Sequence, residues 1–341
     1  MIKILLPDST KGRNKAAFRY FKQYAGVFQA MGIEFTSYGS SYDFVFLGNE
    51  NFQLRKGSLE ASIQFGVDNV NKYNKPVYLI DATDSTSLVG AYEVLKRSRA
   101  RYLFKNQLLN RDDYKIPTYL GKWWWAGKDN TFSYDIPDDM WNRIKLTGWN
   151  LGYHSPTYHE FVDTKVDRDI DVCAIWKTNH DTSSDFEIRN DVKYEAHRSA
   201  PYLILENSKY EIAKGTLPYL EYIDVLKRSK VAISPYGMGE VCFRDFEYMQ
   251  YGIPIIKPTM SNVNTIPDFY MDGKTYIQCK FDYSDLNEVL DEVLGNYDAY
   301  KAIAENARLR FRRRYQTSLL VEHWYKFIKM EPGVSLSNFA Q

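Results

Sequence analysis

Short apolar runs alternate with longer amphipathic runs over the first 120 residues of the chain. The short runs predict β-strands at residues 2–6, 33–36, 43–47, 76–80 and 101–104. The amphipathic runs predict helices at residues 14–31, 59–73 and 87–98. Each of these helices is long enough to join two parallel strands by a right-handed crossover. The pattern therefore predicts a doubly wound α/β domain at the start of the chain.

The alternation stops between residues 115 and 160 and then resumes. The interruption is rich in Pro, Gly, Asp and aromatic residues, including the tryptophans at 123–125, and it predicts a linker or an interdomain surface. Beyond it, strands are predicted at residues 171–176, 202–206 and 231–234, with another strand ending at Lys257. Helices are predicted at residues 219–228, 297–311 and 319–328, and a further helix follows a cap at Asp282 or Ser284.

Two domains of the same α/β class follow from this pattern. We expect a Rossmann-like domain at residues 1–155 and a second Rossmann-like domain at residues 156–318. Residues 319–341 then form a C-terminal helix and tail, which we expect to pack back on the first domain. A length of 341 residues and a hydrophobic content of 44% are sufficient for two ordinary cores.

Charge and cysteine usage exclude several other classes of protein. Lys and Arg number 44 and Asp and Glu number 43, and this balance argues against a dominant nucleic-acid or membrane-surface role. The first apolar run is too short for a signal peptide, and no later run approaches the roughly 20 apolar residues of a membrane span. The three cysteines are widely spaced and form no ligand pair with the five histidines, so neither a disulfide framework nor a zinc site is predicted. We expect a cytoplasmic protein with no metal and no resident cofactor.

Residues 231–258, VAISPYGMGEVCFRDFEYMQYGIPIIKP, predict one βαβ unit. A glycine-bearing turn joins the first strand to the helix, and Gly252 ends the helix. At 100° per residue, the face expected to pack on the sheet carries Cys242, Phe246 and Met249. The opposite face, which is left free for a ligand, carries Glu240, Arg244, Glu247 and Tyr251.

The start of this helix is a predicted anion site, because open α/β sheets bind ligands at the carboxyl ends of their strands and helix N-terminal amides favour anions. Gly237 and Gly239 would let the backbone approach a diphosphate closely. Arg244 would contact the phosphate oxygens, and Glu247 would accept hydrogen bonds from the two ribose hydroxyls. The alternative for these two side chains is an ordinary ion pair on a solvated helix face. The predicted nucleotide-sugar site also includes Glu240, Val241, Lys177 and Lys257.

The pattern Arg244-x-x-Glu247, followed by Gly252-x-Pro254 at the entry to a strand, resembles the donor-site signature of group 1 glycosyltransferases. It is similar also to the signature of exostosin-like enzymes and of phage DNA β-glucosyltransferases. The resemblance covers roughly residues 170–328 and implies the GT-B architecture, in which two Rossmann-like domains face an interdomain cleft. It implies metal-independent transfer of a hexosyl or pentosyl group from a nucleotide sugar to a glycan, a glycoconjugate or a small molecule.

One departure from the family pattern leaves the stereochemical outcome open. Retaining members often carry two glutamates with seven residues between them. Counting back from Glu247 in that register leads to Gly239, whereas Glu240 lies one position later. Both retention and inversion of the anomeric carbon therefore stay open.

An inverting reaction needs a general base, and four residues are candidates. Asp81 and Asp84 follow the predicted strand 76–80, at the edge where the first domain would face the donor. Asp8 follows the first strand, and His154 lies near the predicted hinge with a suitable pKa for a base. The alternatives are capping of a turn by Asp84 and a hinge hydrogen bond by His154.

Other sequence patterns bear on alternative functions. Asp167, Asp169 and Asp171 are spaced like the metal-binding acids of the GT-A architecture, but they precede a strand, so a turn is expected. Five arginines between residues 308 and 314 indicate a solvated helix end, and they keep open an alternative function on modified bases in DNA. A non-catalytic nucleotide-binding GT-B module is the other alternative. The first turn lacks G-x-G-x-x-G, which argues against a dehydrogenase.

Overall fold

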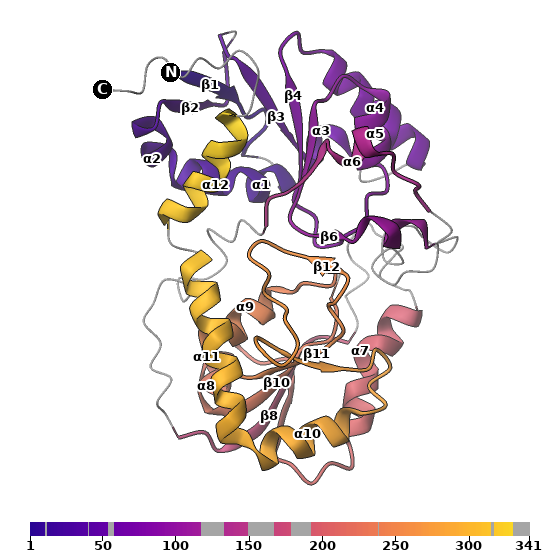
Figure 1. Ribbon diagram of the computed structural model, residues 1–341, viewed down its shortest axis with the longest axis vertical. Coiled ribbons are helices and arrows are strands. Elements are labelled where there is room, and N and C mark those ends of the chain that lie inside the picture. Colours follow the sequence, from indigo (N-terminus) through magenta and orange to yellow (C-terminus); the bar gives the residue numbers. More distant parts are fainter. Residues whose placement is uncertain are drawn as a thin grey trace.

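The computed structural model describes residues 1–10, 12–39, 41–53, 58–116, 133–148, 167–178, 192–237, 239–314 and 317–329. Within these residues the chain forms two parallel β-sheets, which lie one above the other in Figure 1 with helices packed beside each. The N-terminal half of the chain builds the upper sheet and the C-terminal half builds the lower one. The predicted α/β class is confirmed. The domain boundary predicted at residue 155 and the tryptophans at 123–125 lie outside the described residues.

The first sheet has the strand order β2-β1-β3-β4-β5-β7, and the paired strands are parallel. Its strands are β1 (Ile2–Leu5), β2 (Ile33–Thr36), β3 (Phe44–Gly48), β4 (Val77–Asp81), β5 (Tyr102–Lys105) and β7 (Ile144–Leu146). β3 and β4 are buried along their whole length, which explains why their sequences are continuous apolar runs. The strand order reverses between β1 and β3, and such switch points are where open α/β sheets bind ligands.

The helices of the first half lie between these strands in the sequence. They are α1 (Gly12–Gln23), α2 (Ala25–Ala30), α3 (Asn49–Phe52), α4 (Leu59–Asn71), α5 (Ala91–Arg97) and α6 (Asp138–Trp141), with a 3₁₀ turn at Arg111–Lys115. The helix predicted at residues 14–31 is divided at Tyr24 into α1 and α2. Ser58 caps α4, because its side chain accepts a hydrogen bond of 3.1 Å from the Ala61 amide.

The second sheet has the order β13-β11-β10-β8-β9 and is also parallel. Its strands are β8 (Ile170–Ile175), β9 (Ile212–Gly215), β10 (Ser229–Ile233), β11 (Ile255–Pro258) and β13 (Ile277–Cys279). Its helices are α7 (Val192–Leu205), α8 (Tyr219–Arg228), α9 (Phe243–Gln250), α10 (Leu286–Gly295) and α11 (Tyr297–Arg314). The unit predicted from residues 231–258 is thus β10, α9 and β11.

The strand predicted at residues 202–206 is wrong, because this run belongs to α7. A short apolar run does not distinguish a strand from a buried helical segment. In α7 the Tyr202 ring stacks on Trp176 at 4.4 Å, and Leu205 is buried in the core beside the second sheet. The edge strand of this sheet is instead β9, whose mixed sequence IAKG carries little strand signal.

A small sheet and a helix link the halves of the molecule. β6 (Leu108–Leu109) and β12 (Val263–Asn264) form a two-stranded antiparallel sheet at the junction, visible at the centre of Figure 1. α12 (Thr317–Lys329) returns to the first sheet, where the buried Trp324 ring lies 4.8 Å from Phe21 and 5.2 Å from Phe104. Both connections bury apolar side chains from distant parts of the sequence, so they hold the two sheets together.

None of the described helices is long and apolar enough to cross a membrane.

Candidate functional site

The loop between β10 and α9 lies at the carboxyl end of β10, where a parallel sheet presents its ligand-binding loops. α9 begins only at Phe243, with Cys242 as its N-cap residue. The Cys242 amide donates a hydrogen bond of 3.0 Å to Asp245, which satisfies one of the open amides at the helix start. The ligand face predicted from helical spacing is therefore wrong for Glu240, which precedes the helix and belongs to the loop.

Lys257 at the end of β11 does not reach a ligand surface in this structure, contrary to the prediction. Its side chain is 0% exposed and forms an ion pair of 3.2 Å with the buried carboxylate of Asp245. The same ammonium group donates a hydrogen bond to the Ser234 carbonyl, and the Tyr270 hydroxyl donates one of 2.6 Å to Asp245. A buried pair with these additional hydrogen bonds fixes the strand end, and removing either partner would leave an uncompensated buried charge.

Two arginines converge on this loop from different helices. Arg244 of α9 donates a hydrogen bond of 3.0 Å to the Ser234 hydroxyl, and its guanidinium lies 5.9 Å from the centre of the Trp176 ring. Arg198 of α7, which is only 4% exposed, donates to the carbonyls of Lys177 (2.7 Å) and Tyr236 (3.3 Å). Arg198 was not predicted from the sequence, because nothing near it in the chain marks the contact with a loop about forty residues away.

The buried His197 lies close to three positively charged side chains. Burial and the nearby charges of Lys257, Arg198 and Arg244 lower its pKa to about 3. The neutral imidazole instead accepts a hydrogen bond of 3.2 Å from the Tyr236 amide. Burial is the largest cause of this shift, and the three cations add to it. The positive charge of this place therefore rests on the cations themselves, and cations beside a helix N-terminus favour a diphosphate.

Glu247 is half-buried on α9 and is oriented by a neighbouring helix. The Tyr222 hydroxyl of α8 donates a hydrogen bond of 2.6 Å to its Oε2 atom. Burial raises the pKa of Glu247, although the Tyr222 hydrogen bond and the Arg244 charge oppose this rise. Its Oε1 atom forms no hydrogen bond within the described part of the chain, so one carboxylate oxygen is left to accept bonds from a ligand.

Glu240 contacts the first half of the molecule, which differs from its predicted role in sugar binding. Its carboxylate is fully buried and accepts hydrogen bonds from the Thr86 hydroxyl (2.7 Å), the Thr86 amide (3.1 Å) and Gln107 (3.3 Å). Burial raises the pKa of Glu240 despite these bonds. The side chain therefore links the loop that joins β10 to α9, called the donor loop below after its predicted role, to the loop that follows β4. Val241 is also buried, at 1% exposure, so its side chain does not reach a ligand surface.

The glycines of the donor loop permit close packing. A Cβ atom on Gly239 would lie 1.6 Å from the Asp84 carbonyl oxygen, which no side chain tolerates. A Cβ atom on Gly237 would lie 2.9 Å from the Cys242 sulfur. The backbone of Asp84 thus lies directly against Gly239, so the loop that carries this acid is adjacent to the predicted donor site.

Asp81, the last residue of β4, and Asp84, in the loop after it, have opposite environments. Asp84 is half-buried, and burial raises its pKa to about 6, with the Lys105 charge lowering it and the Asp81 charge raising it further. Asp81 is 2% exposed and pairs with the buried Lys105 at 3.0 Å. Burial acts to raise the pKa of Asp81, but Lys105 and hydrogen bonds from Thr83 and Asn49 outweigh it and lower the pKa. Asp81 is therefore a structural ion-pair partner, which corrects its prediction as a base.

The remaining predicted residues lie in varied places. Asp8 is exposed after β1, has φ 50° and accepts a hydrogen bond of 3.4 Å from Asn51. Lys177 is exposed at the carboxyl end of β8. His154 lies outside the described residues.

Asp169 and Asp171, near β8, form ion pairs, which agrees with the expectation of a structural role rather than a metal site. Asp169 pairs with Arg228 at 2.6 Å, and Asp171 pairs with Lys230 at 2.7 Å. Both pairs lie at the amino end of β8, opposite the edge that carries the donor loop. Over the part of the chain that is described, no group of His, Cys, Asp and Glu side chains is arranged to hold a metal ion.

Comparisons of the sequence and of the structure with known proteins identify the fold. A scan of the sequence against protein-family models gives no match, and a search of curated proteins gives none either. HepE (Alr3699) of Anabaena in complex with UDP-glucose matches with a TM-score of 0.52 and 12% identity, over 97% of this chain and 100% of that chain. The same protein in complex with UDP gives 0.53 and 10%, over 97% and 100%.

A second solved structure, sucrose-phosphate synthase from Thermosynechococcus elongatus, matches with a TM-score of 0.54 and 10% identity, over 97% of this chain and 99% of that chain. Both proteins are GT-B glycosyltransferases, and at such low identity the likeness establishes the fold alone. The chain therefore has the GT-B fold, as the sequence predicted.

Proposed function

We propose that the protein transfers a glycosyl group from a nucleotide sugar to an acceptor bound between its two halves. The observation that carries this proposal is the convergence of Arg198, Arg244 and the start of α9 on the loop at Gly237, beside the Asp84 loop. HepE, which shares the fold, is described in complex with UDP-glucose, and this supports a UDP-sugar as the donor. The Arg244-x-x-Glu247 pattern supports the finer assignment to the group 1 or exostosin-like enzymes.

The positive end of the donor site would stabilise the leaving diphosphate. Amides at the start of α9 and the guanidinium groups of Arg198 and Arg244 provide fixed positive charge where negative charge develops, which is an effective form of transition-state stabilisation. Lys177, exposed at the neighbouring strand end, is placed to add to it. We propose that these groups replace a metal ion, so that the reaction needs neither metal nor cofactor.

The ribose would be held by Glu247. A carboxylate oriented by Tyr222 and left with one open oxygen suits a pair of vicinal hydroxyls. In an inverting reaction, Asp84 would remove the proton from the acceptor hydroxyl, since a pKa of about 6 leaves it ionised at neutral pH yet more basic than an ordinary aspartate. A retaining reaction would need no such base, and both outcomes stay open.

Donor binding and donor turnover test the proposal separately. We expect one of the nucleotides UDP, GDP, ADP or CMP to raise the melting temperature, because a ligand at about 100 times its Kd adds about 2.7 kcal/mol of stability. Incubation with the matching nucleotide sugars should release the nucleotide by transfer or slow hydrolysis. Arg244→Ala should abolish the thermal shift, whereas Arg228→Ala, which removes an arginine paired with Asp169, should preserve it. Absence of any shift and of any release across the donor panel would refute the proposed function.

A further inference from the structure

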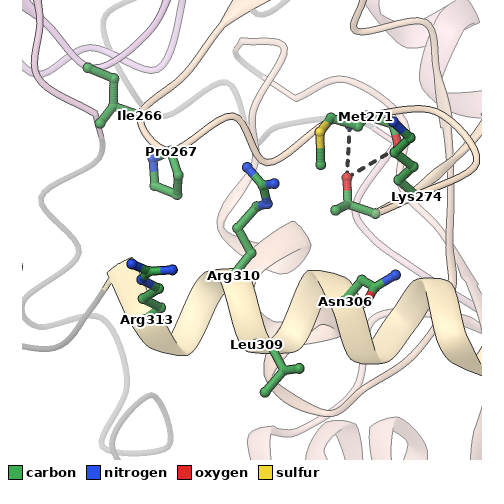
Figure 2. A pocket seen from close by; sticks show the side chains of 9 residues that line it. Ile266, Pro267, Met271, Lys274, Asn306, Leu309, Arg310 and Arg313 are labelled. Carbon is green, nitrogen blue, oxygen red and sulfur yellow. Dashed lines mark hydrogen bonds between the residues drawn. The ribbon is translucent and has the colours of Figure 1, made fainter.

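A pocket of about 600 Å³ lies between the C-terminal half of α11 and the segment that joins β12 to β13. Figure 2 shows this pocket, with Arg310 and Arg313 extending from α11 toward Ile266 and Pro267. None of the residues that form the donor loop or contact it lines the pocket. It is therefore a second site, and its interpretation does not rest on the proposed function.

Three cations line this pocket, and none of its lining residues that the structure describes is acidic. Lys274 comes from the connecting segment, and Arg310 and Arg313 are one helical turn apart on α11. Arg310 donates one hydrogen bond of 3.0 Å to the Asp268 carbonyl, which leaves its other N–H groups available. Neither Lys274 nor Arg313 forms an ion pair with any residue that the structure describes. The nearby carboxylates of Asp268 and Asp272 accept hydrogen bonds from backbone amides instead.

The arginine cluster noted in the sequence is thus divided by the helix. Arg308 pairs with Glu305 within α11 at 2.7 Å, which satisfies its charge locally. Arg310 and Arg313 face the pocket. A solvated helix end explains the first arginine but gives no reason for two arginines and a lysine from another segment to surround one cavity.

The other walls of the pocket are apolar. Ile266, Pro267 and Met271 line it from the connecting segment, and Leu309 of α11 lines it while remaining 55% exposed. Ile266, Pro267 and Met271 are partly buried, so the pocket combines a partly accessible apolar wall with cations. Such a combination suits a ligand with a negative end and an apolar body.

The two walls are held in place by the protein core. Phe311, on α11, and Phe269, on the connecting segment, both pack on Phe246 of α9, at 5.9 and 5.4 Å between ring centres. The buried Thr275 hydroxyl also donates a hydrogen bond of 2.6 Å to the Phe269 carbonyl. Because both walls are fixed by contacts within the protein, we expect little loss of conformational entropy when a ligand binds.

We propose that this pocket binds an amphiphile whose polar end is a phosphate ester. The phosphate accepts charge-assisted hydrogen bonds from Lys274, Arg310 and Arg313, since arginine forks match phosphate oxygens well. The apolar body lies against Ile266, Pro267 and Met271. The ligand is either a lipid in a membrane or a soluble phosphate ester with an apolar group, and these two sources share this chemistry.

Calorimetric titration with a monomeric short-chain phosphatidic acid tests the site directly. The full-length protein should bind it more tightly than inorganic phosphate, which lacks the apolar body, and than the short-chain phosphatidylcholine, whose phosphate carries a neutralising cation. Flotation with phosphatidylcholine vesicles, with and without phosphatidic acid, distinguishes the sources. If the protein binds the monomer and also floats with vesicles that contain phosphatidic acid, but not with pure phosphatidylcholine vesicles, the ligand is a membrane lipid. If it binds the monomer and floats with neither kind of vesicle, the ligand is a soluble ester.

Two triple variants with the same change in charge separate the pocket from general charge attraction. Replacing Lys274, Arg310 and Arg313 by alanine should weaken binding by about tenfold or more, because hydrogen bonds to charged groups are lost. The control replaces three exposed lysines away from the pocket, Lys227, Lys280 and Lys301, and should stay within about twofold of the wild type. If the first triple variant does not fold, the single variant Arg313→Glu at an exposed position replaces it.

Three results would overturn the proposal. The first is failure of the wild-type protein to bind the short-chain phosphatidic acid. The second is an equal loss of binding in the two triple variants, which would indicate nonspecific attraction. The third is inorganic phosphate binding as tightly as the lipid, which would show that the apolar wall contributes nothing.

Discussion

The environment of Asp84, in the loop after β4, disfavours the ionised carboxylate. Replacing this residue by asparagine should therefore change the free energy of unfolding in a way that depends on pH. Burial raises its pKa from 3.8 to about 6, with the Lys105 charge opposing and the Asp81 charge adding to the rise. A carboxyl with a raised pKa in the folded state takes up its proton more readily there than in the unfolded chain. Its contribution therefore favours folding below about pH 4 and is lost as the pH rises toward 6.

The magnitude follows from this rise in pKa. At about 1.4 kcal/mol per pH unit, a rise from 3.8 to about 6 corresponds to about 3 kcal/mol. Because the side chain is only half-buried, water screens part of this effect, and we expect about 1 to 2 kcal/mol. Asp84→Asn removes the ionisation, so the variant should be more stable than the wild type by this amount at pH 7.5 and equal to it near pH 4.

Urea unfolding of both proteins between pH 4 and pH 8 provides the measurement. Asp81→Asn is the matched control, because it lies three residues earlier and should have the opposite effect. Breaking its buried pair with Lys105 should destabilise the fold by about 3 to 5 kcal/mol at neutral pH. If Asp84 is also the base, Asp84→Asn should lower turnover by about 100 to 10,000-fold while donor affinity changes little. A variant at Asp84 that is less stable than the wild type at pH 7.5 would refute this account of the loop.

Three further predictions concern the donor site. Gly239→Ala should lower turnover and increase the radius of gyration measured by small-angle scattering, because its Cβ would overlap the Asp84 carbonyl. An unchanged radius of gyration would contradict the packing of Gly239 on Asp84. Glu247→Ala should weaken nucleotide binding by about 1.5 to 3 kcal/mol, because a charged hydrogen-bond partner is lost. Tyr222→Phe should have a smaller effect. If calorimetry shows that Glu247→Ala binds the nucleotide like the wild type, Glu247 does not hold the ribose. Transfer should persist in EDTA, and activity that is abolished by the chelator and restored by manganese or magnesium would reject the metal-independent mechanism.

The strands β1 to β5 of the first sheet could be placed from the sequence, because a buried strand is recognisable as an apolar run. β3 and β4 are buried on both faces, so their sequences are continuous apolar runs bounded by polar residues. β9 and β7 could not be placed in this way. Both are short and partly exposed, and their sequences IAKG and IKL carry no distinctive periodicity. Their strand conformation depends on pairing with β8 and β5, which only the tertiary structure supplies.

The candidate site was predictable where its chemistry is local to one segment. Arg244 and Glu247 are three residues apart on α9, and the glycine turn that precedes them marks the helix start. Arg198 was missed because its approach to the loop depends on how α7 packs. Asp81 and Lys257 were assigned to the chemistry because they follow strands, but their partners on neighbouring segments bury them in ion pairs. Position after a strand selects candidates, whereas burial and pairing decide which of them reach a ligand.

The one-residue displacement of Glu240 has a structural consequence for the reaction. Position 239, where the retaining enzymes often carry a glutamate, is a glycine that packs on the Asp84 carbonyl, so no carboxylate can occupy it without separating the two halves. The carboxylate of Glu240 is buried and accepts hydrogen bonds from Thr86 and Gln107 of the first half. Glycine at position 239 therefore means that this position carries no glutamate, and it also allows the Asp84 loop to pack against the donor loop. We expect the carboxylate that acts on the acceptor to be Asp84 of that loop, because Asp81 at the end of β4 is paired with Lys105. The opposite stability effects of Asp84→Asn and Asp81→Asn test this distinction.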